Sequence, residues 1–322
     1  MKRKVVWQLV VPLMSLCVLF LLLTPGPADA DETRVPVELS VLFREQDPVW
    51  NTTRDGMEQA AADFGAELRF LAPQTPNDAQ EQLELLEREL ESGADGIVLV
   101  PADRETLADA VRDTSRVVVT LETPMDHTDG YVGVDNRALG EALAHSAMNG
   151  VYRGSTVLLL DSAPGDNGVQ ERLRAARELL EQEGRTVVQV LPTREEEVVD
   201  RLRAMILRMD PSAIMAFEAS VLEDASSLVR TMKAEPAQSW RFPPLLYGTG
   251  STPAIAAGLE QSHITAIQAQ DDFSSGYIAV KTAVEAARGE AAEERSPLPF
   301  LLVRRENMYD MDRQKLLFPV TR

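Results

Sequence analysis

Polar side chains recur directly after short apolar runs along this chain of 322 residues. They are Glu122 with Thr123, Asp161 with Ser162, Glu218, Thr249 with Ser251, and Gln270 with Asp271 and Asp272. Carboxylates, hydroxyls and amides are the groups that hydrogen-bond a small polar molecule. For any one of them a helix cap or a solvated loop is the more ordinary role, and it is their recurrence that indicates a cleft.

The first apolar run is followed by the stretch FREQDPVW at residues 43–50. Pro48 suits the first turn of a helix, because its backbone is already close to the helical conformation. Trp50 then lies at the mouth of that helix, close to Asp47. A flat apolar ring beside polar groups suits the face of a sugar or another amphipathic ligand. A tryptophan packed against its own domain would produce the same pattern, so both interpretations stay open.

The hydrophobic pattern predicts alternating strands and helices that position these residues. The expected strands lie at 37–43, 67–71, 96–100, 117–121, 156–160, 186–191, 213–217, 245–247 and 264–269. They are rich in β-branched residues and nearly continuous in apolar character, as expected of parallel strands buried on both faces. Amphipathic helical stretches separate them. In the stretch 77–93, Asn77 is the candidate cap and Gly93 the stop.

The strand and helix series occurs twice, with a seam near Val132–Asn136. The repetition predicts an α/β fold of two similar Rossmann-like lobes with parallel sheets. Ligands of open parallel sheets lie at the carboxyl ends of the strands, which is where the polar positions fall. A last apolar run at Phe300–Val303 has no long helix after it, so we expect it to return to one lobe and interlace the two.

Residues 1–30 have the features of an export signal. Basic residues at 2–4 precede an apolar stretch at 5–23, and the residues at 28–30 fit a small-x-small cleavage site. An uncleaved membrane anchor is the alternative, since the apolar stretch is near the lower length limit for a spanning helix. The single cysteine, Cys17, lies inside this stretch, so cleavage would leave no disulfide and no thiolate metal site.

Charge and motifs argue against several functions. The formal net charge of −19 opposes binding to nucleic acid, whose phosphates are neutralised by Lys and Arg, and to an anionic membrane surface. The chain contains no GxSxG, HExxH or P-loop motif. Its three histidines, His127, His145 and His263, are scattered along the sequence. We therefore expect no enzyme activity, no cofactor and no metal.

Four stretches, taken in order, resemble the type I periplasmic binding proteins, most closely the branch of the ribose-binding proteins. They are DPVWNTTRDGMEQAAADFGAEL (47–68), ESGADGIVLVPAD (91–103), YVGVDNRALGEALA (131–144) and AIQAQDDFSSGYIAVKTAVEAARGE (266–290). The first is similar to the family's Asn-Pro-aromatic loop and first helix, and the second to its third strand. The last two are similar to its crossings between lobes. The resemblance covers nearly the whole chain after residue 36.

The resemblance implies two lobes joined by a hinge of three segments, with a ligand cleft between them. It places residues 35–135 and 271–299 in the N-terminal lobe, and 136–270 and 300–322 in the C-terminal lobe. The residues that match cleft positions of the family are Asp47, Trp50, Glu122, Arg172, Glu218, Thr249 and Gln270. By this resemblance Trp50 would form an apolar wall, and Arg172 would offer a fork of donors to ligand oxygens.

The chain departs from sugar-binding members of that family at several of these positions. Asp47 to Trp50 stand where such members often have Asn-Pro-Phe-Phe, and Glu122 with Thr123 stands where they often have Asp-Arg. Glu218 begins a pair that is usually Asn-Asp. The acidic side chains favour a polyol with many hydroxyl donors, or a ligand that carries positive charge.

We therefore expect an exported substrate-binding protein that captures a small polar solute, a sugar or polyol, by lobe closure and delivers it to the permease of an ABC transporter. The alternative is an anchored extracytoplasmic receptor that reports its ligand to a sensor kinase, and retention of residues 5–23 would favour it. An enzyme on the same scaffold is a distant third. Sugar-sensing repressors share the fold, but they need an N-terminal DNA-binding module where this chain has an export signal.

Overall fold

The computed structural model describes residues 35–46, 48–191, 198–234, 243–290 and 297–318 of the chain. A first parallel sheet contains β1 (Val37–Leu42), β2 (Ala66–Leu71), β3 (Gly96–Leu99), β4 (Val117–Leu121) and β5 (Gly130–Val132). Its strand order is β2-β1-β3-β4-β5. The helices of this first lobe are α2 (Asn51–Phe64), α3 (Ala79–Ser92), α4 (Arg104–Asp113) and α10 (Asp272–Ala287), and a 3-10 turn, η1 (Pro48–Trp50), precedes α2.

The second lobe is built on a sheet with the order β11-β10-β9-β8-β6-β7. Its strands are β6 (Thr156–Leu160), β7 (Thr186–Val190), β8 (Ala213–Ala216), β9 (Leu245–Thr249), β10 (Ala266–Gln270) and β11 (Phe300–Val303). Its helices are α5 (Asn136–Met148), α6 (Gly168–Gln182), α7 (Val198–Met209), α8 (Ala219–Ala234), α9 (Pro253–Glu260) and α11 (Met311–Leu317). β11 pairs antiparallel with β10, and the other described neighbours pair in parallel.

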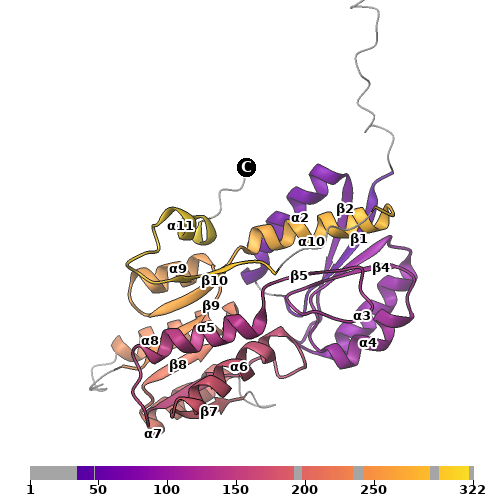
Figure 1. The fold of residues 1–322 in the computed structure, drawn as a ribbon. Coiled ribbons are helices and arrows are strands. Elements are labelled where there is room, and N and C mark those ends of the chain that lie inside the picture. Colours follow the sequence, from indigo (N-terminus) through magenta and orange to yellow (C-terminus); the bar gives the residue numbers. More distant parts are fainter. Residues whose placement is uncertain (1–34, 47, 192–197, 235–242, 291–296, 319–322) are drawn as a thin grey trace, which may run out of the picture. The chain divides into compact units, whose positions relative to one another are not determined.

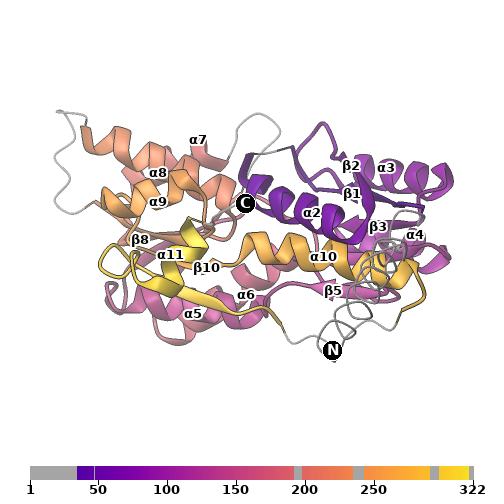
Figure 2. The ribbon, with the colours of Figure 1, turned by 90° about the horizontal axis from the view of Figure 1, so that it is seen from above.

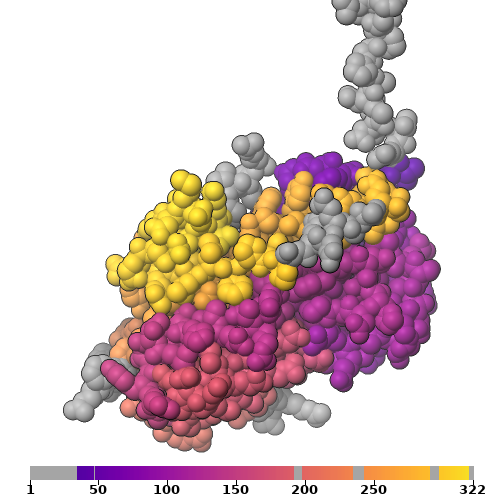
Figure 3. All heavy atoms as spheres, viewed as in Figure 1, coloured from indigo at the N-terminus to yellow at the C-terminus, as the bar shows by residue number. Residues whose placement is uncertain are grey.

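Two late segments cross between the lobes. α10 follows β10 of the second sheet, yet it packs beside α2 of the first lobe in both ribbon views (Figures 1 and 2). β11 then returns to the second sheet, where Phe300 lies opposite Gln270. The C-terminal residues, yellow in Figure 3, lie against the second lobe, and α11 contacts β10. The expected fold of two interlaced α/β lobes is confirmed, while the residues at which each crossing divides the lobes stay a prediction.

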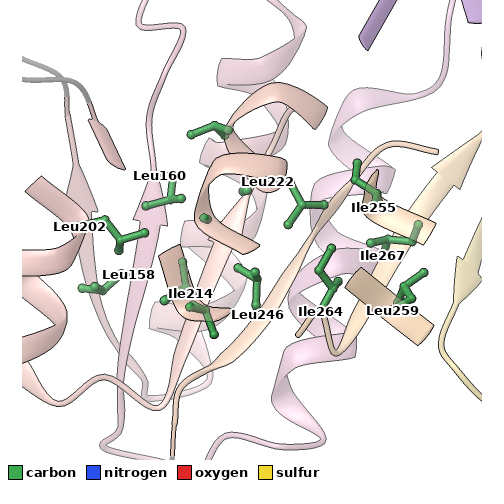
Figure 4. Close-up of a cluster of buried hydrophobic side chains, with 14 of the residues drawn as sticks. Leu158, Leu160, Leu202, Ile214, Leu222, Leu246, Ile255, Leu259, Ile264 and Ile267 are labelled. Carbon is green, nitrogen blue, oxygen red and sulfur yellow. The ribbon is translucent and has the colours of Figure 1, made fainter. Parts of the chain in front are cut away.

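Each lobe has its own apolar core, because helices cover the faces of each sheet. In the second lobe, strand residues Leu158, Ile214, Leu246 and Ile267 pack with Leu222 of α8 (Figure 4). Complete burial of one such side chain contributes about 1.5–3 kcal/mol. These cores hold the strands rigidly, and so they fix where the polar residues at the strand ends lie.

Close contact between α2 and α10 in the first lobe depends on two glycines. A Cβ atom on Gly56 would collide with the carbonyl oxygen of Phe273, and one on Gly276 would collide with that of Thr53. α2 follows the turn that carries Trp50, and α10 begins at Asp272. The helix contact therefore positions two elements that reach the strand-end face.

The structure corrects the expected elements in two places. Asp78, not Asn77, caps α3, and its side chain accepts hydrogen bonds from the backbone N–H groups of Gln80 and Glu81. Asn77 has a positive φ of 59°, whereas a capping residue has an extended backbone. Strand β5 is not in the predicted set, because three residues carry too little pattern to distinguish a strand from a loop.

The N-terminal features fall outside this description. The predicted export signal at residues 1–30 and its apolar stretch lie outside the described residues. Of the helices that the structure does describe, none combines the length and the apolar character needed to cross a bilayer.

Candidate functional site

Side chains from both lobes line one cavity at the carboxyl ends of the parallel strands. It brings together six of the predicted site residues, namely Trp50, Glu122, Arg172, Glu218, Thr249 and Gln270. Asp47 lies outside the described residues. The cavity is also lined by residues that the prediction leaves out, chiefly Arg44, Glu45, Thr53 and Asp272. Its volume is about 40 Å³, which is room for roughly three water molecules.

Arg44 joins the two lobes at this cavity. It follows β1 in the first lobe, and only 2% of its side chain is exposed. Its Nη1 lies 2.6 Å from Oε2 of Glu218, which follows β8 in the second lobe. Within the first lobe its Nε donates to Oε2 of Glu122 at 3.3 Å, and Nη1 donates to Oδ1 of Asn77 at 2.7 Å. Nη1 also lies 3.5 Å from Oε1 of Glu45. The guanidinium is therefore held by carboxylates of both lobes, two from the first and one from the second.

Arg172 of α6 forms a second bridge between the lobes. Its Nη2 lies 3.1 Å from Oε1 of Glu122. Its Nε donates to Oδ1 of Asn136 at 2.7 Å, and its Nη1 donates to the carbonyl oxygen of Phe217 at 3.1 Å. The fork of donors that the family resemblance assigns to ligand oxygens is thus directed at protein acceptors in this structure.

The backbone at two of these positions is strained. Glu122 has a φ of 65° and Asn77 a φ of 59°. This left-handed region costs about 1–2 kcal/mol for an ordinary residue, although asparagine tolerates it better. The carbonyl oxygen of Glu122 accepts a hydrogen bond of 2.8 Å from Nδ2 of Asn136, which helps to hold the conformation. Strain of this kind is concentrated at functional sites, and here it presents both residues to the Arg44 guanidinium.

Electrostatic interactions shift the pKa values of Arg44 and Glu122 in the direction that favours their charged forms. Burial alone would lower the pKa of Arg44, but the charges of Glu218, Glu122 and Glu45 outweigh it, and the pKa is raised. Burial alone would raise the pKa of Glu122, but the charges and hydrogen bonds of Arg44 and Arg172 outweigh it and lower the pKa. Each buried charge is stable only because of its partners.

Asp272 differs from the other carboxylates of the cavity. Its Oδ2 accepts a hydrogen bond of 2.5 Å from Oγ of Ser251, and its Oδ1 accepts one of 2.9 Å from Nε2 of Gln270. Among the described residues it forms no ion pair with a basic side chain. Burial raises its pKa, the two hydrogen bonds oppose this in part, and the nearby charge of Glu122 adds to it. Asp272 is therefore a carboxylate whose negative charge is incompletely balanced.

Trp50 fits both interpretations that the sequence leaves open. Its ring packs against Phe43 with the ring centroids 5.1 Å apart, at the edge of the first core. It also lines the cavity, where the guanidinium carbon of Arg44 lies 5.5 Å from its ring centroid. Its indole Nε1 is buried and has no hydrogen-bond partner in the part of the chain that the structure describes. Trp50 thus packs against the core of the first lobe and also lines the cavity, and its role in binding stays a prediction.

A polar seam beside the cavity holds the lobes against each other. The backbone N–H of Gly168 in the second lobe donates to Oγ1 of Thr123 in the first, at 3.0 Å. Nδ2 of Asn167 donates to the carbonyl oxygen of Ala102 at 2.8 Å. Arg104 and Asp166 form an ion pair of 2.9 Å across the same seam. The lobes are therefore in direct contact beside the cavity.

The chemistry of the cavity suits binding. Among the described residues, no group of three or more His, Cys, Asp or Glu side chains is placed to hold a metal ion. None of the three histidines lines the cavity, and Glu122 and Glu218 are both engaged by guanidinium groups. Asp271, which neighbours Asp272, caps α10 by accepting from the backbone N–H of Ser274 at 2.9 Å. The arrangement offers hydrogen-bonding and charged groups to a polar ligand.

The predicted site residues leave out Arg44 and Asp272 for different reasons, although Asp272 is among the strand-end polar residues that indicate a cleft. Arg44 directly follows the apolar run of β1, and this position is the one signal that could have identified it. Asp272 stands beside Asp271, and successive residues of a helix point about 100° apart. One of the two carboxylates therefore caps the helix while the other faces the cavity, and the sequence does not distinguish them.

Comparisons with known proteins agree with this architecture. A family model described as "Periplasmic binding protein domain" matches residues 40–291. A carbohydrate transporter solute binding protein from Agrobacterium radiobacter, solved with D-arabinose, is 17% identical with a TM-score of 0.77, over 88% of this chain and 100% of that one. GanP, a glucose-galactose binding protein from Geobacillus stearothermophilus, is 19% identical with a TM-score of 0.74, over 86% and 100%.

A third similar structure is the XylFII-LytSN complex, at 14% identity and a TM-score of 0.73, over 85% of this chain and 99% of that one. No curated protein sequence matches the chain. At these sequence identities, similarity to the solved structures shows only that the fold is shared. Membership of the family is shown by the family model, which matches most of the chain. With two interlaced α/β lobes and a polar cavity at their strand ends, the chain belongs to the periplasmic binding protein domain family.

Proposed function

We propose that this protein captures a small polar solute, a sugar or polyol, in the cavity between its lobes and releases it unchanged. The observation that carries the proposal is the convergence of Trp50 and nine polar side chains, drawn from both lobes, on one cavity. Similar structures include one solved with D-arabinose and a glucose-galactose binding protein. An aromatic wall beside hydroxyl, amide and charged groups is suited to a polyhydroxylated ligand.

Solute capture requires the lobes to separate. A cavity of about 40 Å³ is well below the roughly 300–1,000 Å³ of ligand pockets in proteins. The segments that join the lobes, near Val132–Asn136 and at Gln270–Asp272, are short connections between regular elements. Such connections absorb the backbone rotation of hinge closure. The solute would enter the open form, and closure would enclose it.

We propose that the captured solute is delivered to an ABC transporter outside the cytoplasm, after export directed by residues 1–30. A receptor role is the second candidate, because a similar fold occurs in the XylFII-LytSN complex, where it is assembled with another protein. Cell fractionation separates the two. A shortened protein released with the soluble extracytoplasmic fraction supports transport, whereas a full-length protein in the membrane fraction supports an anchored receptor.

The binding proposal is tested by thermal denaturation against a panel of pentoses, hexoses, polyols, amino sugars and nucleosides. A ligand that binds only the native state stabilises it and so raises the apparent Tm. At a ligand concentration of 100 times the Kd, the free energy of unfolding increases by about 2.7 kcal/mol. Calorimetry on Trp50→Ala should then show weaker binding, and Tyr152→Ala, at an aromatic residue that is 84% exposed, should not. Proton NMR of the recovered solute should show it unchanged. The proposal would be refuted if no member of the panel raised the Tm, or if NMR showed that a bound solute had been chemically changed.

A further inference from the structure

The guanidinium group of Arg44 lies between glutamates of the two lobes. The Nη1 atom of Arg44 lies 2.6 Å from Glu218 of the second lobe, and its Nε lies 3.3 Å from Glu122 of the first. The side chain of Glu122 is only 9% exposed and that of Glu218 only 4%. Among the described residues, Arg172 also pairs with Glu122, whereas Arg44 is the basic side chain that pairs with Glu218.

The lining of the cavity carries an excess of negative charge. Its carboxylate residues are Glu45, Glu122, Glu218 and Asp272, and its guanidinium residues are Arg44 and Arg172. With all of them ionised, four negative charges face two positive ones. The cavity therefore favours a positively charged occupant even while Arg44 is present, and does so more strongly without it.

The small volume of the cavity restricts which solutes can bind there. The closed cavity has about 40 Å³ free, which is too little for a sugar-sized molecule, and displacement of the Arg44 side chain would make room between the two glutamates. A neutral solute in its place would leave Glu218 buried without a cation, which is strongly unfavourable. A solute with a protonated nitrogen would restore the pair. The ring of Trp50, 5.5 Å from the guanidinium carbon, would also face such a cation favourably.

We propose that Glu122 and Glu218 form a cation site that Arg44 fills from within in the closed protein, and that the solute of this cleft carries a positively charged nitrogen, as in an amino sugar or amino polyol, that takes its place. The inference rests on the proposed function and narrows its ligand class. Arg44 is then an internal competitor of the solute, and it allows the lobes to close when solute is absent.

The cation site is tested with guanidinium chloride as the probe on Arg44→Ala. At 10 mM guanidinium chloride, compared with 10 mM sodium chloride, the Tm of the variant should rise by about 2–4 °C. Wild type and Arg44→Lys, which keep a cation at the site, should not respond. Arg137→Ala is the matched control, because it removes an arginine that pairs with glutamates on the surface with 64% of its side chain exposed.

A response of Arg44→Ala no larger than that of the control overturns the cation site. Adding Glu218→Gln to Arg44→Ala should abolish the response, since it removes the carboxylate from the second lobe. Should Arg44→Ala be recovered only as unfolded protein, Arg44→Gln, which keeps part of the side-chain volume, is measured in the same way.

The ligand class is tested with matched solutes on the wild-type protein: glucosamine against glucose, and 1-amino-1-deoxysorbitol against sorbitol. The amine of each pair should bind at least tenfold more tightly. A neutral sugar that binds equally well or better refutes the cationic class while the capture of solutes stands. A third outcome is that Arg44→Ala binds guanidinium but no solute, in these pairs or in the wider panel, binds the wild-type protein. This outcome supports the cation site and refutes the capture of solutes.

Discussion

Arg44 Nη1 lies 2.6 Å from Glu218 Oε2, and this ion pair connects the loop after β1 in the first lobe to the loop after β8 in the second. The two side chains are 2% and 4% exposed. Removal of one partner from such a pair leaves the other charge buried without compensation. A substitution at this pair is therefore expected to affect both the stability of the protein and the contact between its lobes.

Glu122→Ala should lower the free energy of unfolding by about 3–5 kcal/mol, the usual cost of breaking a buried ion pair by removing one partner. Glu122 balances two guanidinium groups, those of Arg44 and Arg172, and the alanine variant would leave both with less compensation. Urea unfolding measures the change. Glu91→Ala, at an exposed glutamate of α3, should stay within about 0.5 kcal/mol of wild type. Equal effects of the two substitutions would contradict the assigned role of Glu122.

Gly168→Ala should open the lobes. A Cβ atom at this position would lie 2.6 Å from Nδ2 of Asn136 and 2.7 Å from the carbonyl oxygen of Glu122. The two contacts flank the hydrogen bond that holds Glu122 in its left-handed conformation. The Asn136 side chain belongs to the same lobe as Gly168 and can shift within it, but relief of the collision with the Glu122 carbonyl requires the first lobe to move away. The radius of gyration from small-angle X-ray scattering should therefore increase.

Thr123→Val is the control for that experiment. It removes the hydroxyl that accepts from the N–H of Gly168 but adds no volume to the seam. We expect it to cost about 1 kcal/mol, as the loss of one hydrogen bond usually does, and to leave the scattering curve unchanged. If Gly168→Ala scatters as wild type does, the seam is not what holds the lobes closed.

Much of the fold can be predicted from the sequence, for a physical reason. The strands buried on both faces, such as Val117–Leu121 and Thr156–Leu160, are continuous apolar runs whose predicted and observed bounds coincide. Their pattern reflects burial, which dominates the energy of the core. The capping residue of α3 could not be predicted with the same certainty. Asn77 and Asp78 are both good caps by residue type, and only the backbone conformation shows that Asp78 has this role.

The site could be predicted where it depends on strand ends alone. Glu122, Glu218, Thr249 and Gln270 follow or end strands of the two sheets, and all four line the cavity. Arg172 lies within α6, and the family resemblance rather than the strand pattern identified it. Their role in binding stays a prediction. The pairing of Arg44 with a glutamate 174 residues later in the chain depends on how the lobes meet, and no local pattern encodes that distance.

Gly56→Ala should destabilise the first lobe, although helix propensity alone predicts the opposite. Alanine is favoured over glycine in a helix interior by about 1 kcal/mol. At Gly56, however, the added methyl group would collide with the carbonyl oxygen of Phe273 in α10, and overpacking typically costs about 1–3 kcal/mol. Thermal unfolding should therefore show a lower Tm. As a control, Ala62→Gly, at an exposed position of the same helix, should cost about 1 kcal/mol. A higher Tm for Gly56→Ala would show instead that α10 can move to accommodate the methyl group.

Asp272→Asn should stabilise the protein at neutral pH and have less effect in acid. Burial raises the pKa of Asp272 in the folded protein above its ordinary value of 3.8, so the folded state binds this proton more tightly than the unfolded state does. The resulting stability is fully present below the ordinary pKa and is lost as the pH rises through the raised one. Asparagine stays neutral throughout and can keep the hydrogen bonds with Ser251 and Gln270.

The difference in Tm between Asp272→Asn and wild type should therefore grow between pH 4.5 and pH 8. Glu122, whose pKa is lowered, contributes stability that is lost as the pH falls below its ordinary range, but it does so in both proteins and largely cancels from the difference. Ser251→Ala provides the opposite change. It removes a hydrogen bond that favours the ionised form of Asp272, so its Tm should fall further below wild type as the pH rises. A Tm difference that is constant across this pH range would show that Asp272 is already ionised at no cost in the closed protein.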